Sequence, residues 1–461
     1  MAKGPDSGGV KAVAKYLQRH AEPDAAGAAG IQGTFGHAVV VPAYAEGDPL
    51  FAMLGSVPAG PSGDVLIVLV LNARADSSEA ARQANAATRE RLARELPASV
   101  EVPGEVPLLV YPLPHGRLVL VDRSLPGRWI PEGQGVGLAR KIGCDIALSL
   151  QAAGRVASPW IHATDADTLL PGDYFDQVKR LDPAETGAAI YSFEHRFDPD
   201  PSLGAAARLY EISLRYYVLG LAWSGSPYAY ESMGSCLAIP AVSYASVRGF
   251  PRRNALEDFH ALNKLAKVGT IQRLAGTPVL LEGRVSDRVP ISTGQAIQGL
   301  VGRKGAMDGF SLYHPAVFAH LAAWIRVLGA IARSRGDMQA ALVELPEQNP
   351  FFRTDLLQSA LGELGAFEAV REAISLSKDS ATLLRHLHTW FDALRTQRLI
   401  HLLRDGGLPS LGWLQALDEA PFTGLTSSTE EEPEMLRRHL FAEEKKLSEF
   451  PAGLPSLTLS N

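Results

Sequence analysis

Two continuous apolar runs near the start of the chain constrain its fold most. One lies in HAVVVPAYAEGD, which begins at His37, and the other in DVLIVLVLNARADSS, which begins at Asp64. Apolar runs that do not alternate with polar residues indicate strands covered on both faces, as in a parallel sheet with helices on each side. We therefore expect an α/β protein rather than a sandwich or a helical bundle.

Helical and apolar patterns continue to alternate after these runs. Helices are predicted for SSEAARQANAATRERLAREL (77–96) and GVGLARKIGCDIALSLQAAG (135–154), and strands for GRLVLVDRS (116–124) and the start of SPWIHATDAD (158–167). This order predicts a doubly wound domain, whose ligands bind at the carboxyl ends of the strands. The segments 42–44, 72–77 and 165–167 follow such strands, so we expect them to meet in one crevice.

The length of 461 residues predicts more than one compact part. Residues 1–36 are rich in Gly and Ala and are expected to form an extension with one short helix. Residues 37–299 carry the α/β pattern, and residues 300–461 carry helical patterns. The clearest of these are 353–377 and 380–407, the second ending at Gly406-Gly407.

Composition narrows the class of partner. A net charge of -6 and a pI of about 6.1 provide no overall attraction to nucleic acid, so no nucleic-acid partner is expected. Cys144 and Cys236 lie far apart, which predicts neither a disulfide nor a zinc site. We expect no leader peptide and no membrane span, and hence a cytoplasmic protein, with a peripheral membrane location left open.

The acidic turn Asp165-Ala166-Asp167 is the strongest candidate for chemistry. Two close carboxylates at a strand end can hold a divalent cation and leave positions for the phosphates of a nucleotide. The alternative is an Asx turn or a helix cap. A second pair with the same spacing, Asp198-Pro199-Asp200, has no strand before it and is expected to be a solvated loop.

Five segments occur in order within residues 37–295: VVVPAYAEGDPL, LVLNARADSS, GVGLARKIGCDIAL, HATDADTLLPGDYF and NALEDFHALNKLAKVGTI. In their order and approximate spacing they resemble family 2 glycosyltransferases of the GT-A fold. The resemblance implies a GT-A Rossmann-like domain with a mixed, mainly parallel sheet, and an enzyme of the hexosyltransferase class. Such an enzyme moves a sugar from a nucleotide-diphosphate donor to a hydroxyl of a small molecule or glycan. It uses Mg²⁺ or Mn²⁺, and we expect it to invert the anomeric centre.

The resemblance also implies a donor site. Pro42, Tyr44 and Glu46 would line the nucleoside pocket, and Asp76 would read the base or ribose. Asn72, Arg140 and Lys141 complete the expected donor residues. The turn from Asn72 to Asp76 and the Lys at 141 both depart from the family pattern, which leaves the base open. The alternative for Arg140 and Lys141 is a solvated helix start.

Metal and catalytic roles follow from the same resemblance. Asp165 would face the ribose or the metal, and Asp167 would coordinate the metal, with His260 a candidate extra ligand. Asp258 would be the base that deprotonates the acceptor, with Glu257 as the alternative. Acidic residues at a helix start also stabilise the helix dipole without any catalytic role.

Other segments add further expectations. Met233, Gly234 and Ser235 resemble the turn that lines the acceptor side, or form a plain tight turn. Further candidates are His162 as a ligand, and Arg284, Asp287 and Arg288 as diphosphate contacts from a loop. His386, His388 and His401 are expected on a helix surface.

Three alternatives stay open. One is a retaining GT-A enzyme of the glycosylglycerate-forming type, and another is a sugar-phosphate nucleotidyltransferase. The last is a non-catalytic nucleotide-sugar binder or scaffold. The helical C-terminal region would shape the acceptor site or form a homo-oligomer contact.

Overall fold

The structure, a computed structural model, describes residues 7–60, 63–197, 200–283, 293–301, 309–344, 351–425 and 432–454. Contacts divide the chain into two compact units. Unit 1 comprises Met1–Phe197 and Ser232–Ala296, and unit 2 comprises Asp198–Glu231 and Ile297–Asn461. The segment expected to be a separate N-terminal extension thus belongs to unit 1, and residues 198–231 belong with the C-terminal helices.

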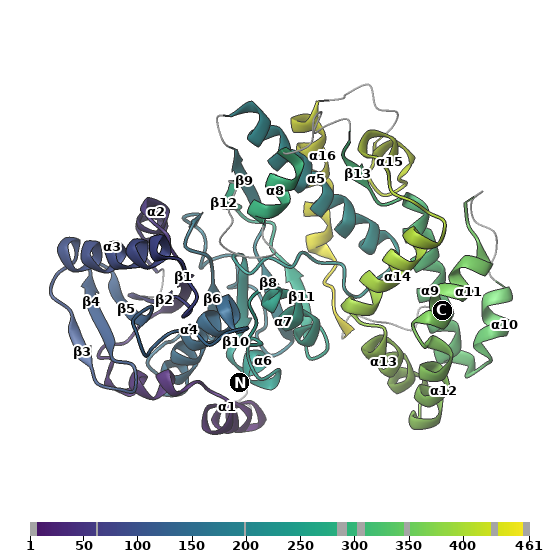
Figure 1. Cartoon of the computed structure of the whole chain (residues 1–461). Coiled ribbons are helices and arrows are strands. Elements are labelled where there is room, and N and C mark those ends of the chain that lie inside the picture. Colours follow the sequence, from purple (N-terminus) through teal and green to yellow (C-terminus); the bar gives the residue numbers. More distant parts are fainter. Residues whose placement is uncertain are drawn as a thin grey trace. The chain divides into compact units, whose positions relative to one another are not determined.

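Unit 1 is an α/β unit built on a sheet that has nine strands among the described residues, in the order β11-β8-β10-β6-β1-β2-β5-β4-β3 (Figure 1). These strands are β1 (His37–Ala43), β2 (Val65–Asn72), β3 (Val100–Val102), β4 (Leu108–Leu113), β5 (Gly116–Arg123), β6 (Trp160–Ala163), β8 (Thr186–Ile190), β10 (Leu237–Pro240) and β11 (Thr270–Arg273). A smaller sheet joins β7 (Thr168–Leu169), β12 (Val279–Gly283) and β9 (Phe193–Phe197).

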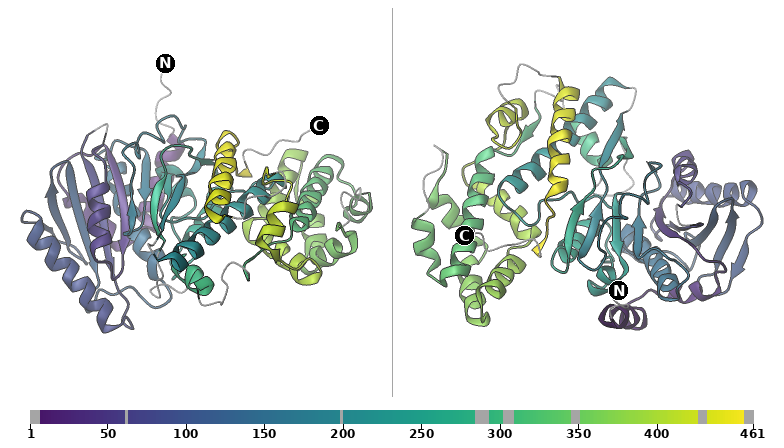
Figure 2. Two further views of the ribbon diagram at one scale, coloured as in Figure 1. Left: turned by 90° about the horizontal axis from the view of Figure 1, so that it is seen from above. Right: turned by 180° about the vertical axis from the view of Figure 1, so that it is seen from behind.

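The helical elements of unit 1 precede, separate and follow these strands in the chain. They are α1 (Ser7–Arg19), η1 (Pro23–Gly30), α2 (Asp48–Ser56), α3 (Glu79–Glu95), α4 (Gly135–Ala152), α6 (Ala241–Ser246) and α7 (Glu257–Leu265), with α8 (Thr293–Val301) crossing the boundary to unit 2. Figure 2 shows these helices and the strands from two further sides.

The core of the sheet is parallel, as the apolar runs predict. β1 pairs in parallel with β2, and β2 with β5, and every residue of β1 and β2 is buried. β6 then pairs in parallel with the other side of β1, with Val39 opposite His162. The strand order therefore reverses direction between β1 and β6, which is where ligands bind in open α/β sheets. The predicted fold class, an α/β sheet with a helical C-terminal region, is confirmed.

An antiparallel hairpin that the sequence pattern does not predict extends one side of the sheet. β3 and β4 pair antiparallel with each other, and β4 pairs antiparallel with β5. β10 is likewise antiparallel to both of its neighbours. The sheet is therefore mixed with a parallel core, as the fold class implied by the resemblance predicts, although the sequence does not predict these antiparallel strands individually. The antiparallel strands lie outside the parallel core that β5, β2, β1 and β6 form.

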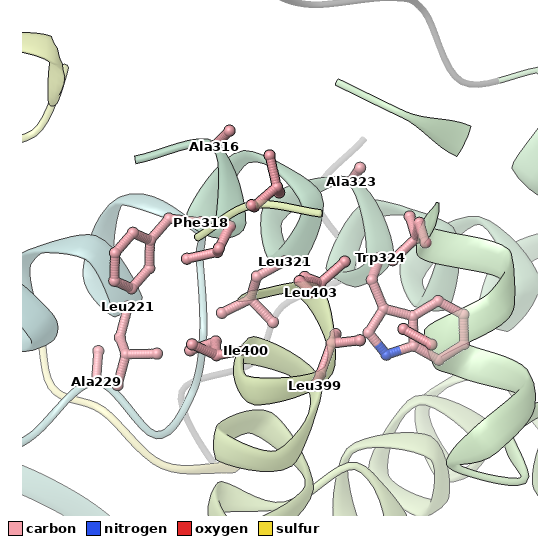
Figure 3. Packing of buried hydrophobic residues seen from close by; sticks show 14 of the residues in the cluster. Leu221, Ala229, Ala316, Phe318, Leu321, Ala323, Trp324, Leu399, Ile400 and Leu403 are labelled. Carbon is pink, nitrogen blue, oxygen red and sulfur yellow. The ribbon is translucent and has the colours of Figure 1, made fainter. Parts of the chain in front are cut away.

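Unit 2 is mainly helical. Its helical elements are α5 (Pro201–Trp223), α9 (Pro315–Ser334), α10 (Met338–Val343), α11 (Thr354–Glu363), α12 (Ala366–Leu376), α13 (Ser380–Trp390), α14 (Ala393–Gly406), α15 (Trp413–Glu419), α16 (Pro433–Lys446) and η2 (Leu447–Glu449). Two short strands, β13 (Ser311–Leu312) and β14 (Leu411–Gly412), pair antiparallel. Figure 3 shows Leu321 and Trp324 of α9 packed with Leu399, Ile400 and Leu403 of α14.

One described helix, α9, is long and apolar enough to cross a membrane, with a mean hydropathy of 1.6 in its most apolar window. Of that window, 78% is buried inside the protein. The core helix of a folded unit has the same properties, so α9 is weak evidence for a membrane span.

Candidate functional site

Side-chain amides tie together the carboxyl ends of β1 and β2. Asn72 Nδ2 donates to the Ala43 carbonyl at 2.9 Å, and Asn85 Nδ2 of α3 donates to the Asn72 carbonyl at 2.9 Å. Asn85 Oδ1 accepts from the backbone N of Ala45 at 3.0 Å. Ala45 has a φ of 53°, a left-handed conformation that costs a non-glycine residue about 1 kcal/mol or more. The chain leaving β1 is therefore held in a set path.

The three residues predicted to line a nucleoside pocket lie on this path. Pro42 is buried within β1, while Tyr44 and Glu46 are half-buried just beyond it. The Tyr44 hydroxyl donates to Ser77 Oγ at 3.2 Å, and the Glu46 carbonyl accepts from Thr88 Oγ1 at 3.0 Å. These residues thus lie beside the end of β2, at the edge of the sheet where a ligand is predicted to bind.

Asp76 lies in the exposed turn after β2. Arg74 donates to it twice, from Nε to Oδ1 at 2.8 Å and from Nη2 to Oδ2 at 3.1 Å. A ligand that Asp76 recognises would therefore meet an Arg-carboxylate pair rather than an isolated carboxylate.

The acidic turn after β6 is closed by hydroxyl groups. Thr164 Oγ1 and Thr168 Oγ1 are 2.8 Å apart, and Thr168 Oγ1 donates to the Asp165 carbonyl at 2.9 Å. β7, which follows the turn, pairs with β12. The turn that carries Asp165 and Asp167 is therefore fixed on both sides, and both acidic residues are half-buried.

Arg140 of α4 joins three segments around this turn. Its Nη2 donates to Asp165 Oδ1 at 2.8 Å, its Nε to Glu257 Oε1 at 3.2 Å and its Nη1 to the Gly234 carbonyl at 2.9 Å. Only 2% of the Arg140 side chain is exposed, so the alternative of a solvated helix start is wrong for this residue. A buried guanidinium with three acceptors is stable only when all of them are in place.

Asp258 completes the cluster. Its Oδ2 accepts from the backbone N of Gly234 at 2.8 Å, and its Oδ1 accepts from the backbone N of Phe259 at 2.7 Å. Glu257 is buried against Arg140, whereas Asp258 is half-buried. Of the two acids, Asp258 is therefore the one more accessible to a substrate.

Burial raises the pKa values of the two acids at the start of α7. It raises the pKa of Glu257 to about 7, against the attraction of Arg140 and with the help of Asp258 and Asp165. Burial also raises the pKa of Asp258, although Phe259 N–H, Arg140 and Gly234 N–H oppose it. Burial lowers the pKa of Arg140, but Asp165 and Glu257 outweigh this and keep it above its usual value. Because three carboxylates surround one guanidinium, the cluster has excess negative charge, which a proton or another cation can balance.

Close backbone contacts position α4 and α7. Gly137 N donates to the Arg253 carbonyl at 3.0 Å, and a Cβ on Gly137 would lie 2.4 Å from the Pro251 carbonyl oxygen. Leu256, immediately before Glu257, has a φ of 59°. A bulky residue in the left-handed region is strained, and such strain is common at functional sites. The Gly-Val-Gly start of α4 therefore allows Arg140 to reach the loop that carries the acid pair.

Lys141 faces a different part of unit 1. Its Nζ donates to the Tyr16 hydroxyl at 2.8 Å, to the His20 carbonyl at 2.7 Å and to Asp145 Oδ2 at 2.6 Å. It also lies 3.2 Å from Glu22 Oε1. The structure thus buries Lys141 beneath the N-terminal segment and does not bring it to the cluster around Arg140, contrary to its expected donor-binding role.

The acceptor-side segment forms a tight turn. Cys236 N donates to the Met233 carbonyl at 3.1 Å, Ser235 is buried and Met233 is half-buried. A Cβ on Gly234 would lie 2.7 Å from Arg140 Nη2, so a larger residue here would displace the guanidinium or the turn. The segment is both a tight turn and a wall of the cluster.

The histidines predicted from sequence are dispersed. His260 is half-buried on α7, two residues after Asp258. His162 is fully buried in β6, where its Nδ1 lies 2.9 Å from the Tyr191 hydroxyl. His386 is exposed as expected, but His388 is 1% exposed, so its surface assignment is wrong. Arg284, Asp287 and Arg288 lie outside the described residues.

The fit of the acidic turn to a divalent cation can be judged from its oxygen atoms. Among the described residues, no group of three or more His, Cys, Asp or Glu side chains is placed to hold a metal ion. The Asp165 side chain is 39% exposed and uses one oxygen for Arg140. Mg²⁺ is often held by one or two carboxylates together with substrate phosphates and water. Asp165 and Asp167 fit a cation that binds in that way.

No protein-family model and no curated protein matches the chain. Among solved structures, TarS residues 1–349 from S. aureus in complex with UDP-GlcNAc is similar at 12% identity, covering 80% of this chain and 92% of that one, with a TM-score of 0.35. The mannosyltransferase PcManGT from Pyrobaculum calidifontis, in complex with GDP-Man and Mn²⁺, is similar at 19% identity. It covers 82% of this chain and 94% of that one, with a TM-score of 0.32. Similarity this distant carries no functional argument, so function is inferred from the residues of the chain itself.

Proposed function

We propose that the protein is a nucleotide-sugar-dependent glycosyltransferase of the GT-A type. One observation carries the proposal. At the point where the strand order reverses, the acidic turn after β6 and the acid pair at the start of α7 meet around Arg140. Transfer of a sugar from a diphosphate donor needs a site for the leaving diphosphate beside a base for the acceptor, and this cluster offers candidates for both.

In the proposed reaction the donor nucleoside lies at the ends of β1 and β2, near Tyr44 and Asn72. A divalent cation, Mg²⁺ or Mn²⁺, would be held by Asp167 and Asp165 and would stabilise negative charge on the diphosphate. Arg140 orients Asp165 for this role through the 2.8 Å bond between them. Arg140 also neutralises part of the negative charge of the cluster when no cation is bound.

Asp258 is the proposed base for direct displacement. The acceptor hydroxyl gives its proton to the Asp258 carboxylate while its oxygen attacks the anomeric carbon. The bond from that carbon to the diphosphate oxygen breaks, and its electron pair leaves with the diphosphate. A pKa that burial raises makes Asp258 a stronger base than an exposed carboxylate, and it is more exposed than Glu257. This route inverts the anomeric centre.

One observation favours the retaining alternative. Both Asp258 oxygens already accept backbone N–H groups. If those bonds occupied Asp258 fully, it would shape the acceptor turn and would not take a proton. NMR of the anomeric product separates the two mechanisms, because a retained configuration is incompatible with Asp258 as the base for direct displacement.

Donor hydrolysis tests the function without knowledge of the acceptor. A panel of UDP and GDP sugars with Mn²⁺ or Mg²⁺ should yield slow release of nucleoside diphosphate from at least one donor. Asp167→Asn should abolish this release. Asp200→Asn is the matched control: it has the same D-x-D spacing but caps α5, accepting from Ser202 N and Leu203 N, and Asn caps helices as well as Asp. A folded protein that binds no donor would contradict the proposal.

A further inference from the structure

Unit 2 contains a cavity of about 400 Å³ that is open to solvent and that the proposed catalytic cluster does not use. α5, the segment 310–313 and α14 line it. The lining residues that matter here are Tyr217, Tyr313, Ser213, Gln397, Arg404 and Ser410. Small-molecule sites usually measure about 300 to 1,000 Å³ and combine aromatic walls with a few polar groups. The cavity has that size and composition.

The charge of the lining narrows the class of ligand. None of the described residues that line the cavity is acidic, so a cation would find no carboxylate in the wall. Among the described lining residues the one cation is Arg404, which donates from Nε and Nη2 to the two oxygens of Asp405 at 2.7 and 3.0 Å. Asp405 compensates part of this charge in an exposed ion pair, so the described wall offers one partly compensated cation, which is little for a phosphate. Amide and hydroxyl groups beside tyrosine rings remain to contact a ligand that is neutral.

The aromatic wall is held in place before any ligand binds. The Tyr313 hydroxyl lies 2.9 Å from His401 Nε2, and the two rings stack with an interplanar angle of 28°. The Tyr216 hydroxyl donates to the Tyr313 carbonyl at 2.7 Å, and the neighbouring β13 pairs with β14. Tyr217 lies against Tyr313 with ring centroids 6.0 Å apart. A wall that is already ordered loses little conformational entropy on binding.

We propose that this cavity is a carbohydrate-binding site for a short neutral glycan. A pyranose ring presents an apolar C–H face, which suits the rings of Tyr217 and Tyr313. Its hydroxyl groups suit the amide of Gln397 and the hydroxyls of Ser213 and Ser410. This inference rests on unit 2 alone. It adds a second sugar site to the proposed glycosyltransferase and does not depend on donor chemistry.

The full chain, without donor or metal, should be titrated with a panel of neutral disaccharides: maltose, cellobiose, mannobiose and N,N′-diacetylchitobiose. Saturation-transfer NMR identifies binders, and calorimetry measures affinity. At least one disaccharide should bind saturably, and Tyr217→Ala and Gln397→Ala should each weaken its affinity by about tenfold. Gln415→Ala is the matched control, since Gln415 is an exposed glutamine of α15 that does not line the cavity.

Three results would overturn the inference: no disaccharide of the panel binds, glucose 6-phosphate or glucuronic acid binds in preference, or binding persists unchanged in both cavity variants. Asp167→Asn separates this inference from the proposed function. If Asp167→Asn loses disaccharide binding while Tyr217→Ala keeps it, the sugar binds at the acidic turn instead. Conversely, glycan binding that survives Asp167→Asn supports the cavity even if no donor is hydrolysed.

Discussion

Arg140 is the residue on which the candidate site depends most. Its planar guanidinium bonds acceptors from the β6 turn, the segment before β10 and the start of α7. Lysine could supply the charge but not three donors in one plane. The proposed base and the proposed metal ligands thus share one positioning residue, so changes around Arg140 should affect both donor and acceptor chemistry.

Replacing Asp258 by Asn tests the base. We expect donor affinity to be largely retained, because the three hydrogen bonds of Arg140 do not involve Asp258 and the amide oxygen of the new side chain can still accept one of the two backbone N–H groups. Transfer to an acceptor should fall roughly 10²- to 10⁴-fold, the usual contribution of a general base. Donor binding is measured by calorimetry and transfer by product formation. Near wild-type transfer in a folded Asp258→Asn variant would rule out this assignment.

Gly234→Ala tests the contact between the acceptor turn and Arg140. The new Cβ would lie 2.7 Å from Arg140 Nη2 and 3.1 Å from its Cζ, so the guanidinium must move away from Asp165 or the turn must shift. We expect donor hydrolysis to fall by about tenfold or more, since small misplacements of catalytic groups are costly.

The matched control for that change is Gly172→Ala, because a Cβ on Gly172 would meet no other atom within 4 Å. Equal donor hydrolysis by Gly234→Ala and Gly172→Ala would mean that the Arg140 contact does not matter for the reaction.

At the scale of elements, the N-terminal segment is part of the support for α4 and α7. Glu22, just before η1, pairs with Lys141 of α4 and accepts from Arg252 Nε and Nη2 at 2.9 and 3.1 Å. Arg252 lies in the loop that leads to α7. The segment therefore links the helix that carries Arg140 to the loop before the acid pair, although the sequence pattern suggests only a tail.

Lys141→Met tests whether Lys141 supports the fold or binds the donor. Asp145 is completely buried, and Lys141 Nζ bonds it at 2.6 Å. Removing one partner of a buried ion pair costs about 3–5 kcal/mol, because the other charge is left uncompensated. We expect a loss of this size in the free energy of unfolding in urea.

The double variant Lys141→Met/Asp145→Asn should recover much of that stability, since no buried charge is then unpaired. It should also bind the nucleotide sugar as the wild type does. Loss of donor binding by a stable double variant would restore Lys141 to the donor site.

The sequence predicts elements whose pattern is local and misses those defined by distant partners. β1 and β2 are predictable because uninterrupted apolar residues suit strands buried on both faces. α5 received no prediction, although Asp200 and Pro201 form a typical helix start. Charged residues interrupt the apolar pattern on its buried face, which makes the helix hard to predict from sequence. Glu211 and Arg215 lie in a network with Arg437 and Glu444 of α16.

The candidate site follows the same rule. Asp165 is predicted at a strand end and Glu257 at a helix start, and the structure agrees. The burial of Arg140 could not be predicted, because the acceptors of Arg140 lie 25, 94 and 117 residues away in the chain. Basic residues are mostly exposed, so burial of one is decided by tertiary partners.

At the scale of the whole molecule, each unit buries several histidines, and His162 and His388 are among the most deeply buried. His162 of unit 1 is completely buried, and burial, together with His37, lowers its pKa to about 3. His388 of unit 2 is 1% exposed, and burial lowers its pKa to about 4. Both rings are neutral in the folded protein at pH 5, whereas an unfolded chain protonates them below about pH 6.5.

Stability should therefore fall with pH, and His388→Leu should reduce the fall. Between about pH 6.5 and pH 4 the unfolded state binds a proton at position 388 that the folded state does not. The free energy of unfolding thus decreases as pH falls, by roughly 1.4 kcal/mol per pH unit for one such histidine. Urea unfolding of the full chain at pH 7.5, 6 and 5 measures how steeply the free energy of unfolding of unit 2 changes with pH. His388→Leu should flatten it, whereas His115→Gln, which changes an exposed histidine, should not. Parallel losses in the wild type and His388→Leu would mean that protonation of His388 does not drive acid unfolding of unit 2.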